Sequence, residues 1–253
     1  MPNDHHVGKD RRILILGGTA EARVLAGRLL TNGCSVVSSL AGVTENPMLP
    51  DGEVRMGGFG GVDGLVDYLS SANINLLIDA THPFAAIMSQ HAHAAAQFLS
   101  LPLLRLERPI WQAQAGEHWT HAIDMARAVE LLPDNAKVFV TTGRKNLRLL
   151  FGRGDLRGLI RSIEAPAENL PQNWQLLQDR PPHLAADEAA LMKQHGITHL
   201  LTKNAGGAST YGKIVAAREL GVSLVMIDRP LKPVCPTSFT IDALIDAVDQ
   251  RFA

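Results

Sequence analysis

The segment "LLIDATHPFAAIMSQHAHAAA" places an acid and an imidazole where an apolar run ends, with Asp79, Thr81 and His82 followed by Pro83. Proline is favoured at the first position of a helix, so we predict a helix beginning at Pro83 with Thr81 or His82 as its N-cap. An imidazole there titrates near neutral pH and can act as a general acid, donate to a carbonyl or orient a nicotinamide ribose. A histidine that only caps the helix is the alternative, and the residues alone leave both open.

A glycine turn in "ILILGGTAEARVLAGRL" joins a predicted strand to a predicted helix. Gly17 and Gly18 permit a sharp turn, Thr19 is placed to cap the helix, and the first-turn amides would face an anion such as a pyrophosphate. Glu21 would repel a phosphate, so we expect it to cap the helix or bind a ribose hydroxyl. The third glycine of the dinucleotide fingerprint is missing, and a turn that merely connects two elements is the alternative.

The second predicted strand ends in "SSLAGVT", without the acid that binds the ribose 2′-hydroxyl of NAD. Ser38, Ser39 and Thr44 can instead hydrogen-bond a 2′-phosphate, which favours NADP, although ordinary strand and loop hydroxyls would look the same. The next arginine is Arg55. The glycines of "GGFGG" that follow it permit close approach of a ligand to the backbone, or form a plain connector.

Cations follow two predicted strands of the second half, in "FVTTGRKNL" and "LLTKNAGGASTYGKIVAARELG". We expect Arg144, Lys145, Lys203 and Lys213 to gather at the carboxyl edge of a sheet, where such side chains bind carboxylates. A single lysine would be read as part of a solvated loop, but several together favour an anionic ligand. Tyr211 and Lys213 are two residues apart, which excludes the Tyr-x-x-x-Lys pair of short-chain dehydrogenases.

The candidate site residues must be positioned by the elements around them. Short apolar runs alternate along the chain with stretches of helical periodicity, which is typical of parallel α/β folds. The predicted strands are 12–18, 34–42, 75–81, 101–107, 137–144, 156–163, 173–179, 198–204 and 222–230. The predicted helices are 20–31, 61–71, 83–98, 185–195, 209–220 and 240–252. We predict two Rossmann-like parallel-sheet domains, residues 1–112 and 113–253, with a ligand cleft between them.

The bulk composition narrows the class of protein. A chain of 253 residues with 46% hydrophobic residues and a net charge of -1 can bury a sizeable core, and nothing in it points to a nucleic-acid surface. Two cysteines are too few for a disulfide scaffold or a zinc site, and His91 and His93 would point to different faces of a helix, so we expect no metal. The polar N-terminus and the short apolar runs predict a cytoplasmic protein without a membrane partner.

The motifs together resemble the precorrin-6A reductase family of corrin-ring biosynthesis. The segments that carry the resemblance span nearly the whole chain: "ILILGGTAEARVLA", "GGFGG", "DATHPFA", "LRLERPIW", "TTGRKNL" and "TKNAGGASTYGKIVAARELGVSLVMIDRP". The resemblance implies NADPH-dependent reduction of one double bond of the precorrin-6A macrocycle to give precorrin-6B. It also implies a two-domain Rossmann-like fold that holds the cofactor and a large tetrapyrrole bearing many carboxylates.

The resemblance and the strand ends together suggest a role for each group of residues. We assign the NADPH site to residues 1–112 and the substrate side to residues 113–253. The expected cofactor-binding residues are Gly17, Gly18, Thr19, Glu21, Ser39, Ala41, Gly42, Gly58, Thr81, Pro83 and Phe84. The expected substrate-binding residues are Thr142, Arg144, Lys203, Asn204, Gly206, Gly207 and Lys213. His82, Asp79 and Tyr211 are the candidates for delivering a proton.

Several alternatives stay open from the sequence. An NADP-dependent reductase of a smaller anionic carbonyl compound and a non-catalytic nucleotide-binding sensor would share the first domain, but the sensor would need neither His82 nor the cations. The pyrophosphate could bind the "NAGGAST" turn instead of "GGTAEAR". Whether the macrocycle carries cobalt, and whether the protein is a monomer or a small homo-oligomer, cannot be read from the residues.

Overall fold

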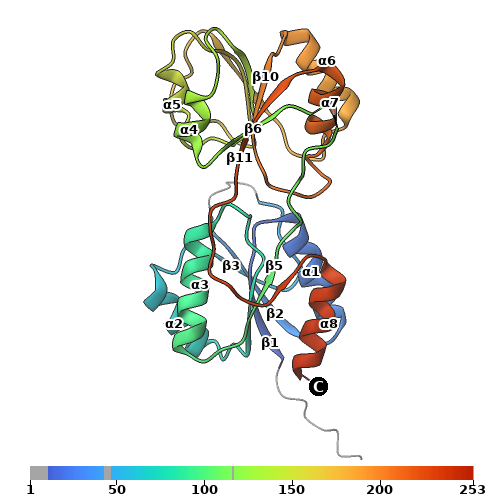
Figure 1. The fold of residues 1–253 in the computed structure, drawn as a ribbon. Coiled ribbons are helices and arrows are strands. Elements are labelled where there is room, and N and C mark those ends of the chain that lie inside the picture. The colour runs from blue at the N-terminus through green and yellow to red at the C-terminus, as the bar shows by residue number, and fades with distance from the viewer. Residues whose placement is uncertain (1–10, 43–46, 116, 253) are drawn as a thin grey trace, which may run out of the picture. The chain divides into compact units, whose positions relative to one another are not determined.

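The computed structural model describes residues 11–42, 47–115 and 117–252. The chain divides into two compact units (Figure 1): unit 1 comprises Met1–Arg108 and Leu231–Ala253, and unit 2 comprises Pro109–Pro230. Each unit is built on a six-stranded sheet whose strand pairs are all parallel, with helices on both faces. The predicted α/β class with two parallel-sheet domains is therefore confirmed.

Unit 1 contains six strands and four helices within the described residues. The strands are β1 (Arg12–Leu16), β2 (Ser35–Leu40), β3 (Glu53–Met56), β4 (Leu76–Asp79), β5 (Leu103–Leu106) and β12 (Thr237–Ser238). The helices are α1 (Ala20–Thr31), α2 (Val62–Ser71), α3 (Ala86–Phe98) and α8 (Ile241–Phe252).

Alternate residues of the central strands of unit 1 face opposite layers of helices. Ile13 and Ile15 of β1 pack in one buried cluster with α1 and α8, whereas Leu14 and Leu16 pack in another with α2 and α3. All four side chains are almost completely buried. A parallel sheet covered on both faces needs such continuous apolar strands, and this explains why the run "ILIL" lacks polar residues.

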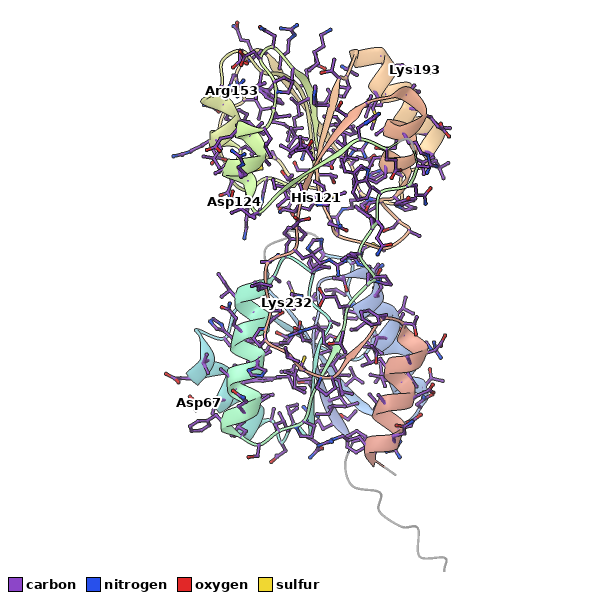
Figure 2. All side chains as sticks on the ribbon, viewed as in Figure 1. Asp67, His121, Asp124, Arg153, Lys193 and Lys232 are labelled. Atoms are coloured by element: carbon purple, nitrogen blue, oxygen red, sulfur yellow. The ribbon has the colours of Figure 1, made fainter. Side chains whose placement is uncertain are left out.

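Unit 2 likewise contains six strands and four helices within the described residues. The strands are β6 (Trp119–Ala122), β7 (Lys137–Val140), β8 (Arg157–Ser162), β9 (Trp174–Gln178), β10 (His199–Lys203) and β11 (Ser223–Ile227). The helices are α4 (Met125–Glu130), α5 (Arg148–Phe151), α6 (Ala185–His195) and α7 (Gly212–Leu220). Apolar side chains of α6 and α7 pack on the sheet, whereas polar residues such as Lys193 point outward (Figure 2).

The strand order explains where ligands can bind in each unit. Sheet 1 runs β3-β2-β1-β4-β5-β12 and sheet 2 runs β9-β8-β7-β10-β11-β6, which is the same doubly wound pattern. The order reverses between β1 and β4 in unit 1 and between β7 and β10 in unit 2. Open α/β sheets bind ligands beyond the carboxyl ends of the strands at such a switch point.

The sixth strand of each sheet comes from an unexpected part of the chain. In unit 1 the sixth strand is β12, which follows all of unit 2 in sequence and pairs with β5. In unit 2 it is β6, which precedes the other five strands of that unit and pairs with β11. The prediction that residues 113–253 form the second domain therefore differs from the observed division. The amphipathic helix α8 buries Leu244, Ile245 and Val248 in the core of unit 1, and this burial draws the C-terminal segment back.

Two structural features are absent from the described residues. No helix there has the length and apolar character needed to cross a membrane. The same part of the chain has no group of three or more His, Cys, Asp or Glu side chains arranged to hold a metal ion.

We predict that Leu244→Ala lowers the free energy of unfolding by about 2–5 kcal/mol, because it leaves a cavity at a fully buried position of α8. Urea unfolding followed by circular dichroism measures the loss. The matched control is Phe98→Ala, whose side chain is 77% exposed on α3, and it should change stability by less than about 0.5 kcal/mol. Equal effects of the two substitutions would contradict the placement of α8 in the core.

Candidate functional site

The carboxyl ends of β1 and β4 meet at the switch point of unit 1 and form one side of a shallow pocket. Since these strands are neighbours in register, Leu16 and Asp79 lie opposite each other, and the turns that follow them share one edge. The pocket is lined by Thr19, Glu21, Ala80, Thr81, Pro83, Leu106, Glu107 and Arg108. It thus collects residues from three strand ends that the sequence places far apart.

The glycine turn after β1 leaves open space beside the backbone of Gly18. Thr19 is the N-cap of α1, as predicted: its hydroxyl oxygen accepts from the Ala22 amide at 3.1 Å and donates to the Ala80 carbonyl at 3.0 Å. Gly18 has φ +101°, and a Cβ atom built on it would meet nothing within 4 Å. A ligand can therefore approach the backbone at Gly18, as binding of a pyrophosphate at this helix end requires.

Two ion pairs border the same pocket. The Glu21 Oε1 atom lies 3.4 Å from Arg108 Nη1, and the Glu107 Oε1 atom lies 3.3 Å from Lys232 Nζ. Glu21 does not cap the helix, because Thr19 does. Its Oε2 atom is buried without a hydrogen-bond partner among the described residues, so it can accept from a ribose hydroxyl.

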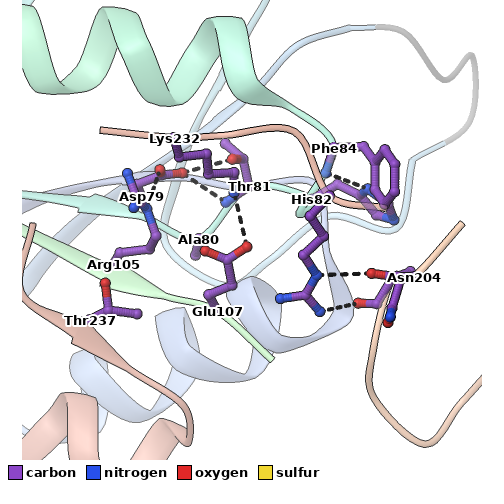
Figure 3. Close-up of polar contacts among 12 residues, drawn as sticks. Asp79, Ala80, Thr81, His82, Phe84, Arg105, Glu107, Asn204, Lys232 and Thr237 are labelled. Atoms are coloured by element: carbon purple, nitrogen blue, oxygen red, sulfur yellow. Dashed lines mark hydrogen bonds and ion pairs between the residues drawn. The ribbon is translucent and has the colours of Figure 1, made fainter. Parts of the chain in front are cut away.

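Asp79 is the most constrained acid of the site (Figure 3). Its side chain is 1% exposed, and its Oδ1 atom accepts from the Thr81 amide at 3.2 Å and from the Thr81 hydroxyl at 2.7 Å. Its Oδ2 atom accepts from Arg105 Nε at 3.1 Å, and Arg105 Nη1 donates to the Pro233 carbonyl at 2.9 Å. The carboxylate therefore ties the end of β4 to β5 and to the returning C-terminal segment.

These contacts determine the ionisation of Asp79. Burial opposes the charged form, but the nearby hydroxyls of Ser89 and Thr81 and the positive charges of Lys232 and Arg105 outweigh it. The pKa of Asp79 is therefore lowered from its ordinary value of 3.8. A carboxylate that stays ionised and buried at neutral pH has no proton to deliver.

His82 lies in a turn before the helix and does not cap it, so the predicted helix start is wrong. The first helical residue of α3 is Ala86, its N-cap Ala85 makes no side-chain bond, and the Ala85 amide donates to the His82 carbonyl at 2.8 Å. The His82 Nδ1 atom accepts from the Phe84 amide at 3.2 Å. Residues 82–85 therefore form a separate turn before α3. Ala85, with φ -92° and ψ 49°, does not have a helical backbone conformation.

The end of β2 carries the residues expected to read the cofactor's ribose. Ser38 and Ser39 are buried, and the Ser38 hydroxyl has no hydrogen-bond partner among the described residues. Arg55 lies opposite Ser39 on β3, with Nη1 3.5 Å from the Ser39 hydroxyl. Its guanidinium stacks on Phe59, 3.9 Å from the ring centroid, and donates to the carbonyls of Gly57 and Gly58.

The neighbouring turn contains the rest of this predicted group. Ala41 and Gly42 are exposed just beyond β2. Gly42 has φ +70°, a conformation that suits glycine. Thr44 lies outside the described residues.

The carboxyl edge of sheet 2 does bring predicted cations together. Lys203 ends β10, the neighbour of β7, and its Nζ atom donates to the Thr142 carbonyl at 2.8 Å just beyond β7. Arg144 follows in the same turn, with Nη1 3.0 Å from Glu164 Oε2. Burial and the positive charge of Lys145 lower the pKa of Lys203 from its ordinary value of 10.5. The Thr142 hydroxyl is buried without a hydrogen-bond partner in the described chain.

The "NAGG" turn after β10 is pinned by Trp111. The Asn204 amide accepts from the Trp111 backbone at 2.8 Å and donates back to its carbonyl at 3.0 Å. The Trp111 indole donates to the Gly207 carbonyl at 2.9 Å, and Gly206 and Gly207 have φ +69° and +77°. Because both the oxygen and the nitrogen of the Asn204 side-chain amide are bonded to the Trp111 backbone, we expect Asn204 to shape the turn.

Lys213 and Tyr211 lie around the same indole. Lys213 is 6% exposed in the first turn of α7, with Nζ 5.2 Å from the Trp111 ring centroid, while the Tyr211 ring centroid lies 5.8 Å from it. A cation packed on an aromatic face is less available to a ligand than Lys203 at the strand end.

The sequence of this chain matches a known protein family. The family described as "Precorrin-6x reductase CbiJ/CobK" matches residues 12–249. The chain belongs to this family.

Members of the precorrin-6x reductase family resemble the chain over nearly its whole length. It is 46% identical to the Precorrin-6A reductase of Rhodococcus erythropolis, over 94% of this chain and 96% of the relative. It is 30% identical to the Cobalt-precorrin-6A reductase of Priestia megaterium, over 86% and 90%. A solved structure, "CobK precorrin-6A reductase", superposes with a TM-score of 0.89 at 40% identity, covering 94% of this chain and 96% of that one.

Sequence reasoning missed three basic residues near the candidate site of this family member: Arg105, Arg108 and Lys232. Arg105 lies inside an apolar run, and this pattern predicts a strand but no charged partner for it. Lys232 follows the last predicted strand of the second half, so nothing in its neighbourhood placed it in unit 1. A polar residue inside an otherwise buried strand is a usable signal, because burying a charge requires a partner.

We predict that Asp79→Asn lowers the free energy of unfolding by about 3–5 kcal/mol at pH 7, since it leaves Arg105 buried without its counterion. A carboxyl whose folded pKa is lowered stabilises the fold above its ordinary pKa, and this contribution is lost as the pH falls below 3.8. The difference between wild type and variant should therefore shrink below that pH. Urea unfolding between pH 7 and pH 3 measures it.

The control for this prediction is Asp67→Asn on the exposed face of α2, which should change stability by less than about 0.5 kcal/mol. A gap between wild type and Asp79→Asn that stays constant down to pH 3 would rule out the stabilising role of the Asp79 charge.

Proposed function

We propose that this protein reduces precorrin-6A to precorrin-6B with NADPH, transferring a hydride to one double bond of the macrocycle in cobalamin biosynthesis. Membership of the precorrin-6x reductase family, with relatives named precorrin-6A reductase that match nearly the whole chain, carries the proposal. The two strand-end edges support it with one surface suited to a dinucleotide and another suited to an anion.

The cofactor's phosphates fit the carboxyl edge of sheet 1. Gly17, Gly18 and Thr19 present the amides of α1 to the pyrophosphate. A 2′-phosphate at the end of β2 would accept from the Ser39 hydroxyl and from the guanidinium of Arg55, which lie on the same face of the sheet, whereas the Ser38 side chain faces the opposite layer of helices. No carboxylate ends β2, so this edge favours NADPH over NADH.

The "NAGG" turn is the weaker candidate for the pyrophosphate. Its first residue, Asn204, is bonded to Trp111 through its side chain, and the Gly207 carbonyl accepts from the indole. The helix that follows begins at Gly212, several residues further along, and its N-cap makes no side-chain bond. The "GGTAEAR" turn, in contrast, runs directly into α1.

The substrate's carboxylates fit the carboxyl edge of sheet 2, where Arg144, Lys203 and the Thr142 hydroxyl lie together. Fixed cations supply orientation for a molecule that carries many acetate and propionate groups. Two relatives named Precorrin-6A reductase are 46% and 41% identical to the chain, whereas two named Cobalt-precorrin-6A reductase are 30% and 25% identical to it. We therefore infer that the substrate is the metal-free macrocycle.

The reduction needs a hydride, which bound NADPH supplies, and a proton. The chain's task is chiefly to hold the reacting groups in line, and this positioning supplies much of the reduction of the barrier in such transfers. His82 is the proton donor that we propose, because its side chain is exposed just beyond the end of β4 and a protonated imidazole can act as a general acid. Asp79 is excluded from this role by its ionisation, and Tyr211 lies against Trp111 in unit 2.

The decisive experiment mixes the protein and NADPH anaerobically with metal-free precorrin-6A and follows nicotinamide absorbance. Oxidation of NADPH with a matching change in the tetrapyrrole spectrum is expected. The cobalt form serves as the second substrate and should turn over more slowly. Tight NADPH binding without turnover of either form would overturn the proposal.

We predict that Arg55→Gln weakens NADPH binding about 10- to 100-fold, the value of a charge-assisted contact to phosphate, and leaves NADH binding unchanged. Fluorescence titration measures both dissociation constants. Arg12→Gln is the matched control, because Arg12 pairs with Glu53 at the opposite end of the same sheet. If Arg55→Gln weakened both cofactors equally, Arg55 would not read the 2′-phosphate.

We predict that Lys203→Met raises the KM for precorrin-6A about 10-fold or more and leaves the dissociation constant of NADPH unchanged, because it removes a cation from the substrate edge alone. Steady-state kinetics and NADPH titration measure the two effects. Arg157→Gln, at the amino end of β8 in the same sheet, should change neither. If Lys203→Met left the KM for precorrin-6A unchanged, Lys203 would not bind the substrate's carboxylates.

A further inference from the structure

The hydroxyl of Thr81 has its only proton committed to Asp79. The Thr81 Oγ1 and Asp79 Oδ1 atoms are 2.7 Å apart, and an ionised carboxylate can only accept hydrogen bonds. Arg105 holds the other carboxylate oxygen from the side of β5. Whatever meets the remaining lone pairs of Thr81 Oγ1 must therefore bring a proton of its own.

The surroundings of Thr81 in the pocket strengthen this constraint (Figure 3). The Thr81 amide already donates to Asp79, the Ala80 amide donates to the Leu16 carbonyl at 3.0 Å, and Pro83 has no amide proton. The Thr19 hydroxyl donates to the Ala80 carbonyl. Ala80, Thr81 and Pro83 and the hydroxyl of Thr19, which all line the pocket, thus have no uncommitted donor to offer a ligand.

We propose that Asp79 is a positioning residue that makes the Thr81 hydroxyl an acceptor for an N–H donor, the carboxamide of the reduced nicotinamide. This inference rests on the proposed function, because it assumes that a nicotinamide binds at the edge of sheet 1. A primary carboxamide offers two N–H donors. A pyrrole N–H of the substrate has the same chemistry, but Thr81 shares its sheet edge with Gly18, where the dinucleotide is expected.

The test compares two cofactors that differ only in this donor. Reduced 3-acetylpyridine adenine dinucleotide phosphate replaces the carboxamide by a methyl ketone, which keeps the carbonyl and lacks the N–H. Dissociation constants for it and for NADPH are measured by fluorescence titration without substrate. Wild type should bind NADPH about 2- to 10-fold more tightly, the value of one neutral hydrogen bond.

Three variants separate the roles of the two side chains. Thr81→Val keeps the shape without the hydroxyl and should reduce the preference for NADPH to about 1-fold. Thr81→Ser restores the hydroxyl and should recover the preference. Asp79→Asn replaces the carboxylate by a carboxamide, which offers the Thr81 hydroxyl both a donor and an acceptor. The hydroxyl is then no longer held as an acceptor, and the preference for NADPH should fall.

A second buried ion pair supplies a matched control for loss of stability. Arg161 of β8 and Glu188 of α6 lie 2.6 Å apart in unit 2, with side chains 8% and 2% exposed. Glu188→Gln should lower the melting temperature as Asp79→Asn does, because each substitution neutralises the acid of a buried pair, but it should keep the wild-type preference for NADPH.

Two results would overturn the inference while NADPH-dependent turnover by the wild type keeps the proposed function intact. The first is a cofactor preference that Thr81→Val or Asp79→Asn leaves unchanged. The second is an unchanged preference with a raised KM for precorrin-6A in Thr81→Val, which would move the N–H donor to the substrate. If Asp79→Asn does not fold, the comparison of Thr81→Val with Thr81→Ser still decides the acceptor role. A wild type that binds neither cofactor would instead refute the proposed function.

Discussion

The buried ion pair between Asp79 and Arg105 is the constraint on which the edge of sheet 1 depends. A carboxylate that is 1% exposed is tolerable only with a counterion and hydrogen-bond donors, and the pair recruits them from β5 and from the turn after β4. Arg105 also binds the Pro233 carbonyl, so the requirement extends to the segment that returns from unit 2. One desolvated charge thereby fixes the Thr81 turn and the path of the C-terminal chain together.

Each edge keeps its charges in place through local partners, which reconciles a net charge of -1 with anionic ligands. Arg55 is held by Phe59 and by two carbonyls, and Lys203 by the Thr142 carbonyl. Side chains that are already oriented lose less conformational entropy when a ligand arrives. The two edges therefore favour anions by arrangement of a few cations and not by an overall positive charge.

The sequence predicted the parallel α/β architecture because apolar runs that alternate with helical stretches have few other solutions. It predicted the Thr19 cap and the edge of sheet 2 because both depend on residues close in sequence or on strand ends. It missed β3, β6 and β12, because their sequences, EVRM, WTHA and TS, form no apolar run and these strands are defined by their partners. Arg105 and Lys232 were missed for the same reason: their roles come from contacts between distant segments.

The closure of sheet 1 by β12 also determines the order in which the protein can mature on the ribosome. Unit 2 is continuous in sequence, so all of its strands have been synthesised once Pro230 has left the exit tunnel. Unit 1 begins before unit 2 but is completed after it, because β5 lacks its outer neighbour and α1 lacks α8 until residues 237–252 emerge. The nascent chain must therefore keep an exposed apolar face and an unpaired strand edge throughout synthesis of the inserted unit, a state that chaperones protect from aggregation.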